Sequence, residues 1–188
     1  MRYQSHYGDE RITKWDIFHA TYALLHHPGY RQRFATNLKR ELPRLPFAPD
    51  FHAFAKAGKK LAALHTGYET AAEFPLKRTV QRGIPPSLRV EKMRWATPDK
   101  LALTYNESLT LTGIPPEVFG YKLGNRSALE WVLDQYQVST DPRSGLECDP
   151  NRPDDEGYIV RLLGQVITVS LETLKIVRAL PSDFGAAE

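Results

Sequence analysis

The stretch GNRSALEWVLDQYQVSTDPRSGLECDPNR, residues 124–152, concentrates side chains that carry charge or form hydrogen bonds. Asn125 and Arg126 directly precede a short amphipathic segment that begins at Ser127, where the start of a helix would expose backbone N–H groups. An arginine, an amide and free N–H groups suit contacts with phosphate oxygens or with the edges of bases. Ser127 and Glu130 also form a capping-box pattern, so a capped structural turn is an equal alternative.

Cationic residues continue on both sides of this stretch. In LRVEKMRW, a predicted strand places Arg89 on one face and Lys92 with Arg94 on the other. Such side chains, lying near aromatic residues, can hold a phosphate backbone. The sequence therefore predicts a nucleic-acid-binding surface formed by Lys77, Arg78, Arg82, Arg89, Arg94, Tyr121, Lys122, Asn125, Arg126, Arg143 and Ser144.

The formal net charge is only +3, but the charges are unevenly distributed along the chain. Lys and Arg outnumber Asp and Glu by 11 to 6 in residues 1–69 and by 9 to 5 in residues 70–126, whereas residues 127–188 hold 5 against 11. The basic first two thirds suit a phosphate backbone, and the acidic last third suits a protein neighbour or solubility. Blocks in a sequence need not form patches in space, so an unpatterned surface is the alternative.

The local signatures of several enzyme classes are absent from the sequence. There is no G-x-x-x-x-G-K-[ST] loop for ATP, no G-x-G-x-x-G dinucleotide loop, no H-E-x-x-H zinc motif and no G-x-S-x-G nucleophile turn. The single cysteine, Cys148, can form no internal disulfide, which favours a reducing, cytoplasmic environment. No apolar run reaches the length of a membrane span, and we predict neither catalytic nor metal-binding residues.

Isolated histidines and carboxylates leave weaker alternatives. His19 and His26 share a helix face and could bind a metal with a third ligand, but histidines at helix ends more often satisfy the final carbonyls. His65, four residues before Glu69, could act as a polarised base. The acidic residues of the last third could hold Mg²⁺ or Ca²⁺, although their spacing is not that of an EF-hand. We expect packing, turns and solvation to account for these groups.

Hydrophobic periodicity predicts an α+β fold that is mainly α-helical, with helices at both ends and a small central antiparallel sheet. Helical repeats occupy residues 12–74, and Gly58 suggests that another backbone approaches the third helix closely. Alternation within 86–112 predicts an antiparallel hairpin or sheet around the turn TPDK. Residues 115–181 are again predicted to be helical, with a polar loop at STDPRSGLECDPNRPDDEG and a long buried helix at the end. The whole chain, 1–188, is expected to be one domain or a fragment of one.

Four blocks in order carry a resemblance to a known family: YALLHHPGYRQRFATNLKRELPRLPF, FHAFAKAGKKLAALHTGYE, YKLGNRSALEWVLDQYQVSTDPRSGLECDPN and VITVSLETLKIVRALP. Together they resemble the C-terminal target-recognition region of Type ISP restriction-modification enzymes, from about Ile12 to Pro181. Those large polypeptides combine a nuclease, a helicase-like ATPase, a coupler, an N6-adenine methyltransferase and a target-recognition domain. The family region begins well before this sequence does, so part of the DNA-reading surface is expected to lie outside it.

The resemblance implies a DNA-binding specificity module that positions double-stranded DNA for the methyltransferase and nuclease of the same polypeptide. The N-P-P-Y motif of adenine methylases is absent, so this chain is expected to bind rather than catalyse and to hold no cofactor. S-adenosylmethionine, ATP and Mg²⁺ are expected to serve the full-length enzyme. The alternatives are a module that docks on methyltransferase or helicase domains without touching DNA, and a hydrolase with dispersed catalytic groups.

Overall fold

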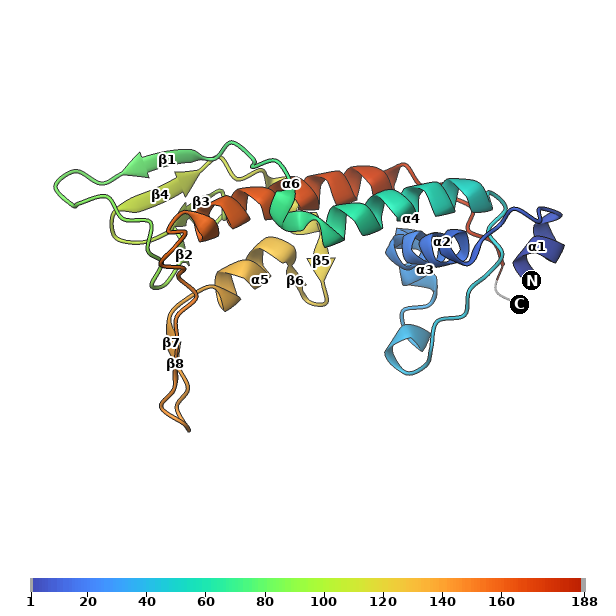
Figure 1. Cartoon of the computed structure of the whole chain (residues 1–188), viewed down its shortest axis with the longest axis horizontal. Coiled ribbons are helices and arrows are strands. Elements are labelled where there is room, and N and C mark those ends of the chain that lie inside the picture. The colour runs from blue at the N-terminus through green and yellow to red at the C-terminus, as the bar shows by residue number, and fades with distance from the viewer. Residues whose placement is uncertain (1, 187–188) are drawn as a thin grey trace. The chain divides into compact units, whose positions relative to one another are not determined.

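The computed structural model describes residues 2–186, and its helices and small antiparallel sheet confirm the predicted α+β, mainly helical class (Figure 1). The residues cluster into two compact units. Unit 1 comprises Met1–Gly67 and Thr173–Glu188, and unit 2 comprises Tyr68–Glu172. The last helix, α6 (Tyr158–Arg178), supplies residues to both units.

Unit 1 is helical apart from its connecting loops. In chain order, its elements are α1 (Arg2–Tyr7), α2 (Lys14–His26), α3 (Pro28–Arg33), the 3-10 turn η1 (Asn37–Lys39), α4 (Phe51–Thr66) and the end of α6. Its core is apolar and aromatic, and the largest fully buried side chains in it are Ile12, Tyr30, Phe54 and Leu61.

The helices α2 and α4 pack closely because α4 carries a glycine at their contact. A Cβ atom added at Gly58 would lie 1.7 Å from the carbonyl oxygen of His19. The missing side chain therefore lets the two backbones meet, which confirms the prediction from the sequence. The start of α4 is fixed locally, since Asp50 Oδ1 accepts a hydrogen bond from the Ala53 N–H at 3.0 Å.

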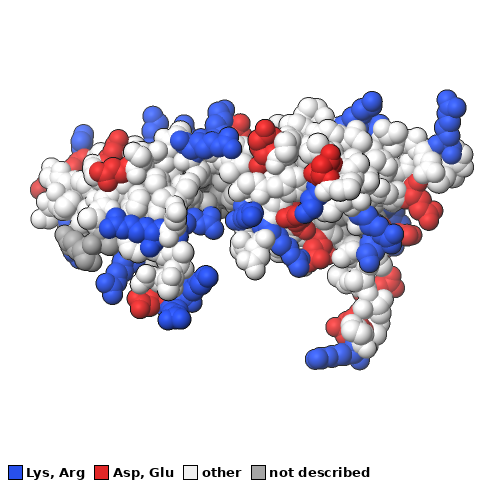
Figure 2. Space-filling model, turned by 180° about the vertical axis from the view of Figure 1, so that it is seen from behind, with Lys and Arg blue, Asp and Glu red and all other residues white. Residues whose placement is uncertain are grey.

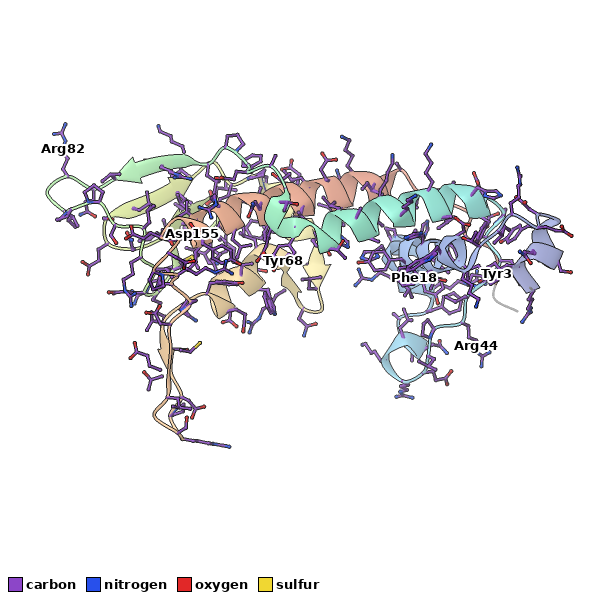
Figure 3. All side chains as sticks on the ribbon, in the orientation of Figure 1. Tyr3, Phe18, Arg44, Tyr68, Arg82 and Asp155 are labelled. Atoms are coloured by element: carbon purple, nitrogen blue, oxygen red, sulfur yellow. The ribbon has the colours of Figure 1, made fainter. Side chains whose placement is uncertain are left out.

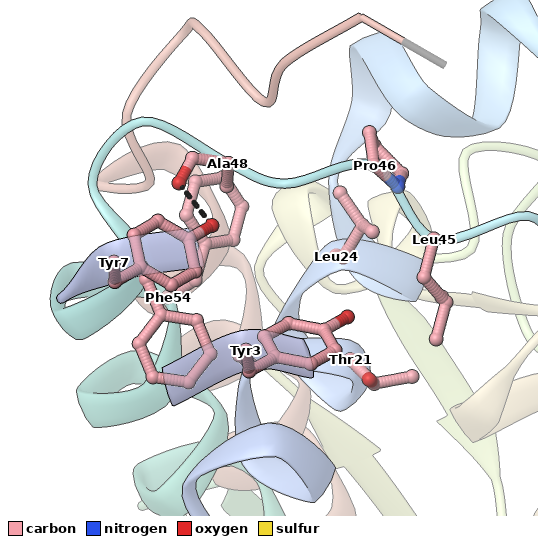
Figure 4. Close-up of a pocket in the computed structure, with 10 residues that line it drawn as sticks. Tyr3, Tyr7, Thr21, Leu24, Leu45, Pro46, Ala48 and Phe54 are labelled. Carbon is pink, nitrogen blue, oxygen red and sulfur yellow. Dashed lines mark hydrogen bonds between the residues drawn. The ribbon is translucent and has the colours of Figure 1, made fainter. Parts of the chain in front are cut away.

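The helix α1 closes one end of this core (Figure 4). The Tyr7 hydroxyl donates to the Ala48 carbonyl oxygen at 2.7 Å, and the Tyr3 and Phe51 rings pack with centroids 5.7 Å apart. The apolar pocket left between α1, α2 and α4 measures about 10 Å³. That volume holds about one water molecule, so this pocket is a packing gap rather than a small-molecule site.

Unit 2 is organised around a four-stranded antiparallel sheet in the order β1-β4-β3-β2. Its strands are β1 (Lys77–Val80), β2 (Arg94–Trp95), β3 (Ala102–Thr104) and β4 (Leu109–Thr112). Side chains alternate between its two faces: Leu109 and Leu111 are buried, whereas Thr110 and Thr112 are partly exposed. One face of the sheet therefore belongs to the core, and the other is polar.

The buried face packs with α5 (Ala128–Gln135) and with the part of α6 that lies in unit 2. The Ser127 hydroxyl accepts from the Glu130 N–H while the Glu130 carboxylate accepts from the Ser127 N–H, so the predicted capping box starts α5. The 3-10 turns η2 (Tyr68–Thr70) and η3 (Pro116–Gly120) complete the unit. Its core includes Leu103, Leu109, Leu111, Leu129, Val132, Ile159, Leu162, Leu163, Val166 and Ile167.

Two hairpins extend from this core. β5 (Lys122–Leu123) pairs with β6 (Arg126–Ser127) across a turn in which Gly124 has a φ of +69°. β7 (Ser139–Thr140) pairs with β8 (Glu147–Cys148). Figure 1 shows that the β7–β8 hairpin projects from the rest of unit 2.

The strand expected across LRVEKMRW is much shorter than predicted. Only Arg94–Trp95 pairs with β3, so the expected placement of Arg89 and Lys92 on opposite faces of a strand is wrong. A side chain occupies the backbone groups that a neighbouring strand would need: Asn151 Oδ1 accepts from Val90 N at 2.8 Å, and Asn151 Nδ2 donates to Val90 O at 2.7 Å. Side-chain bonds of this kind compete directly with strand pairing.

Four elements differ from the sequence expectations. β1 lies outside the expected sheet region of 86–112, α1 precedes the first expected helix, and the β7–β8 hairpin lies where a polar loop is expected. All four residues of β1 are exposed, as are all residues of β7 and β8. These strands are held by backbone pairing, so their sequences carry no hydrophobic alternation that would reveal them.

Candidate nucleic-acid interface

The face of the sheet opposite the core is lined by threonines and ends in an arginine. One register line crosses all four strands and joins Thr79, Thr110, Thr104 and Arg94. These residues, here called the outer face, are all exposed or half-buried. Lys77 lies on the same side at the β1 edge, two positions from Thr79. Hydroxyl and guanidinium donors on one face suit hydrogen bonds to phosphate and sugar oxygens.

Two open grooves adjoin the outer face and share two cations. The first groove, of about 410 Å³, includes Arg89 and Thr104 in its lining, and the second, of about 470 Å³, includes Arg126. Lys92 and Arg94 line both grooves. Across residues 2–186, the side chains of Lys92 and Arg94 have no ion-pair or hydrogen-bond partner. Their charges are therefore available to a ligand.

The acidic side chains of the second groove are held by cations of the same unit. Glu130 accepts from Lys100 Nζ at 2.5 Å and from the Ser127 N–H at 2.9 Å, and these bonds lower the pKa of Glu130 to about 2. Asp134 accepts from the Arg126 guanidinium at 2.5 Å. Because each of these two carboxylates is paired with a cation, the charges that remain unpaired in this groove are those of Lys92 and Arg94, and they are positive.

Three of the predicted arginines are engaged in ion pairs: Arg126 with Asp134, and also Arg89 and Arg78. The Arg89 guanidinium donates to Asp149 Oδ2 at 2.6 Å. Hydrogen bonds from the backbone and side chain of Asn151, together with this arginine, lower the pKa of Asp149 to about 2. Arg78 lies 3.5 Å from Glu73. Each arginine shares its charge with a carboxylate, which weakens its attraction for a phosphate.

The tip of the β7–β8 hairpin presents Arg143 and Ser144. Asp141 Oδ1 accepts from the Arg143 N–H at 2.9 Å, from the Ser144 N–H at 2.7 Å and from the Ser144 hydroxyl at 3.0 Å. These bonds, led by that of the Ser144 backbone, lower the pKa of Asp141. Gly145 closes the turn with a φ of +69°. The backbone of the tip is thus fixed, while the Arg143 side chain has no described partner.

The β5–β6 hairpin brings together the remaining predicted residues. Lys122, Asn125 and Arg126 are exposed, and Arg126 faces the second groove. Tyr121 instead packs against the core of unit 2, and its carbonyl oxygen accepts from the Ala128 N–H at 3.1 Å. A further predicted cation, Arg82, follows β1 and points away from the sheet (Figure 3). The structure therefore gathers Arg94 and Arg126 at the grooves and leaves Arg82 at a loop tip.

The sequence matches the model of the Type ISP C-terminal specificity domain over residues 1–162. The chain belongs to this family. No match is found among curated proteins. The chain is similar to three solved structures: a nuclease-deletion mutant of the Type ISP restriction-modification enzyme LlaGI in complex with a DNA substrate mimic, the ATP-dependent Type ISP enzyme LlaBIII bound to DNA, and the DrdV–DNA complex.

Sequence identities to these structures are 38%, 34% and 39%, with TM-scores of 0.84, 0.84 and 0.83 respectively. The alignments cover 92%, 93% and 97% of this chain. They cover only 16%, 12% and 19% of the solved chains, so the specificity domain spans less than a fifth of the length of these relatives.

Sequence reasoning missed several groups that line this surface of the specificity domain. Lys92, expected beside Arg94 but left out of the predicted surface, lines both grooves, and Asn106 and Gln137 line one groove each. The threonines are visible in sequence as the alternation of LALT and LTLT. Their alignment with Arg94 depends on the strand register, which alternation does not specify.

Charge is distributed differently between the two units of the specificity domain. Unit 1 holds 13 Lys and Arg against 7 Asp and Glu, whereas unit 2 holds 12 against 15. Figure 2 shows Lys and Arg interspersed with Asp and Glu on one face of the molecule. The candidate interface therefore lies in a unit of net negative charge, with Lys92 and Arg94 as local cations that line both grooves.

The histidines of the specificity domain have structural partners. His26 Nδ1 lies 2.8 Å from the Tyr22 carbonyl oxygen, as expected for a helix end, and the ring nitrogens of His65 contact Tyr22 Oη at 2.7 Å and Thr173 Oγ1 at 2.8 Å. Burial lowers the pKa of His65 to about 4. In the described part of the chain, no group of three His, Cys, Asp or Glu residues could hold a metal, and no helix is long and apolar enough to cross a membrane.

Proposed function

We propose that this specificity domain binds DNA through unit 2 and recognises the target sequence there. The proposal is carried by the family membership together with three related structures that contain DNA, each covering more than nine tenths of this chain. Lys92 and Arg94, which are unengaged at the junction of two grooves, are the best placed phosphate ligands. The outer face adds hydroxyl donors beside them.

The charge distribution supports different roles for unit 1 and unit 2 in DNA binding. The excess of 13 Lys and Arg over 7 Asp and Glu in unit 1 attracts a polyanion at long range, independently of its sequence. Unit 2, with its net negative charge, disfavours indiscriminate contact outside its few unengaged cations. Such a surface suits selective binding better than a uniformly basic one.

The catalytic steps belong to other parts of the polypeptide in this proposal. LlaBIII is an ATP-dependent restriction-modification enzyme, and the specificity domain corresponds to only 12% of its chain. We infer that a nuclease, an ATPase and an adenine methyltransferase act outside residues 1–188, with S-adenosylmethionine, ATP and Mg²⁺ as their cofactors. The specificity domain would position double-stranded DNA for them and would catalyse no reaction itself.

The proposal is tested by measuring the affinity of the 188-residue chain for duplex DNA by fluorescence anisotropy over a salt series. Each neutralised phosphate is expected to contribute about −0.9 to the slope of log affinity against log salt concentration. Three or four phosphate contacts therefore predict a slope of about −3 to −4. Arg94→Ala should weaken binding and reduce the magnitude of the slope by about 0.9. Arg40→Ala, which removes an exposed arginine from unit 1, is the matched control.

Two results would contradict the proposal. Absence of binding at about 50 mM salt would refute DNA binding by this chain, because electrostatic attraction is strongest at low ionic strength. An equal change of slope for Arg94→Ala and Arg40→Ala would show that the interface does not involve Arg94.

An exposed aromatic face on α2 favours a second candidate function, docking on another part of the polypeptide. Trp15 is 71% exposed and Phe18 is 51% exposed, with ring centroids 5.9 Å apart. Tyr30, in contrast, is fully buried, so it forms no part of this face. The double variant Trp15→Ser/Phe18→Ser should lower co-sedimentation with a separately supplied methyltransferase part while leaving DNA affinity unchanged. Unchanged co-sedimentation would exclude docking through α2.

A further inference from the structure

The β7–β8 hairpin is ordered without contributing to a hydrophobic core. All residues from 139 to 149 are exposed, and Leu146 near the tip is 72% exposed. Apolar burial therefore cannot be the reason for its conformation. Its backbone is fixed instead by strand pairing, by Gly145 and by the three hydrogen bonds to Asp141.

The base of the hairpin is attached to the segment that leads into the two grooves. Asn151 forms paired hydrogen bonds with Val90 N and Val90 O, and the Val138 N–H donates to the Glu91 carbonyl oxygen at 2.9 Å. The Arg89–Asp149 ion pair lies beside these bonds. Both strands of the hairpin are thus held by residues 89–91, directly before Lys92. The direction of the hairpin is coupled to the position of the proposed DNA-binding cations.

The dimensions of the hairpin fit the major groove of DNA. From Ser139 to Asp141, two extended steps of about 3.3 Å give about 7 Å, and the turn at residues 142–144 with the Arg143 side chain extends beyond them, so the tip spans the groove depth of about 8.5 Å. A two-stranded ribbon enters the major groove, about 12 Å wide, but is too broad for the minor groove of about 6 Å. The tip residue most suited to base contacts is Arg143, because the one hydroxyl proton of Ser144 is already donated to Asp141 Oδ1.

We propose that the β7–β8 hairpin inserts into the major groove and that Arg143 is a specificity-determining residue that recognises guanine. The guanidinium donates to the O6 and N7 acceptors of one guanine, while Asp141 and Gly145 hold the backbone from which Arg143 extends. This inference rests on the proposed function, since it requires DNA on unit 2.

The first experiment selects binding sites from random duplexes with the 188-residue chain and with its Arg143→Ala and Arg143→Lys variants. The wild-type chain should enrich a sequence with at least one fixed guanine. Arg143→Ala should lose the preference at that position, with about a 5- to 150-fold drop in discrimination, and retain the other positions. Arg143→Lys keeps the charge but not the planar fork, so it should retain non-specific affinity and lose most of the discrimination. The control variant Arg40→Ala should enrich the same DNA sequence as the wild-type chain.

The second experiment probes the groove itself. The fixed guanine is replaced by 7-deazaguanine, which lacks the N7 acceptor in the major groove and is unaltered in the minor groove. Wild-type binding should weaken, whereas Arg143→Ala should bind both duplexes equally, because the contact is already lost. Equal weakening in both proteins would show that another residue contacts that guanine and would overturn the inference.

The outcomes separate the two proposals. If the wild-type chain enriches a sequence and Arg143→Ala enriches the same one, the role of Arg143 is refuted while target recognition stands. A uniform loss of affinity in Arg143→Ala with an unchanged sequence would reduce Arg143 to a phosphate contact and refute the inference. Binding without any enriched sequence, or no binding at all, would contradict the proposed function as well.

Discussion

Replacing Gly58 by alanine should destabilise unit 1, although alanine is the better helix former. The added Cβ atom would lie 1.7 Å from the His19 carbonyl oxygen, and Cβ atoms essentially never come within 3.0 Å of another heavy atom. The difference requires α2 and α4 to separate by about 1.3 Å at this point. The obstacle is a backbone carbonyl of α2, so no side-chain rotation can relieve it.

The size of the effect follows from two opposing terms. Overpacking of a core costs about 1–3 kcal/mol, and a rigid backbone contact places Gly58→Ala near the upper value. Against this cost, the higher helix propensity of alanine stabilises the folded state by about 1 kcal/mol relative to glycine. We therefore expect the free energy of unfolding to fall by about 2 kcal/mol.

The assay is urea denaturation followed by far-ultraviolet circular dichroism, with Ala63→Gly as the matched control. Ala63 is exposed on the same helix, so this variant should lose about 1 kcal/mol through helix propensity alone. Gly58→Ala and Ala63→Gly are opposite substitutions, and both should be destabilising. Stabilisation of Gly58→Ala by about 1 kcal/mol would refute the close contact between α2 and α4.

Two further predictions concern ionisation and the anchoring of the hairpin. Burial lowers the pKa of His65 from 6.5 to about 4, so the unfolded chain takes up the proton first and stability should decline as the pH falls from 6.5 towards 4. In His65→Gln, the difference in bound protons between the unfolded and folded chains should fall by up to one, which weakens the dependence of the urea midpoint on pH. An unchanged dependence would contradict the lowered pKa of His65. Asn151→Ala should lose the paired bonds to Val90, at a cost of about 1–3 kcal/mol, and speed up amide hydrogen exchange in the β7–β8 hairpin. Asn125→Ala, in an exposed turn, is the control and should change neither quantity.

Much of the fold follows from local signals in the sequence. The capping box of Ser127 and Glu130 and the backbone contact at Gly58 are both where the sequence places them. The long last helix is also predicted correctly, because its buried stripe extends over residues 158–178. Each of these features depends on neighbours in the chain or on one helical face.

The elements that the sequence does not predict depend on partners distant in the chain. Residues 88–93 read as a strand, but Asn151, about sixty residues later, occupies the backbone groups of Val90. β1 and the β7–β8 hairpin lack a buried face, so pairing alone defines them. All of the candidate cations are exposed. The sequence places Lys92 beside Arg94, but only the structure shows that both line two grooves, one shared with Arg89 and the other with Arg126.

The central claim is that unit 2 contacts DNA through its outer face, its two grooves and the β7–β8 hairpin. Amide hydrogen exchange of the 188-residue chain, measured with and without duplex DNA, tests this claim most directly. The account predicts that DNA slows exchange in residues 87–95, 102–112 and 139–148, with smaller changes in α2 and α4. Protection confined to unit 1, with unchanged exchange in those three segments, would contradict it.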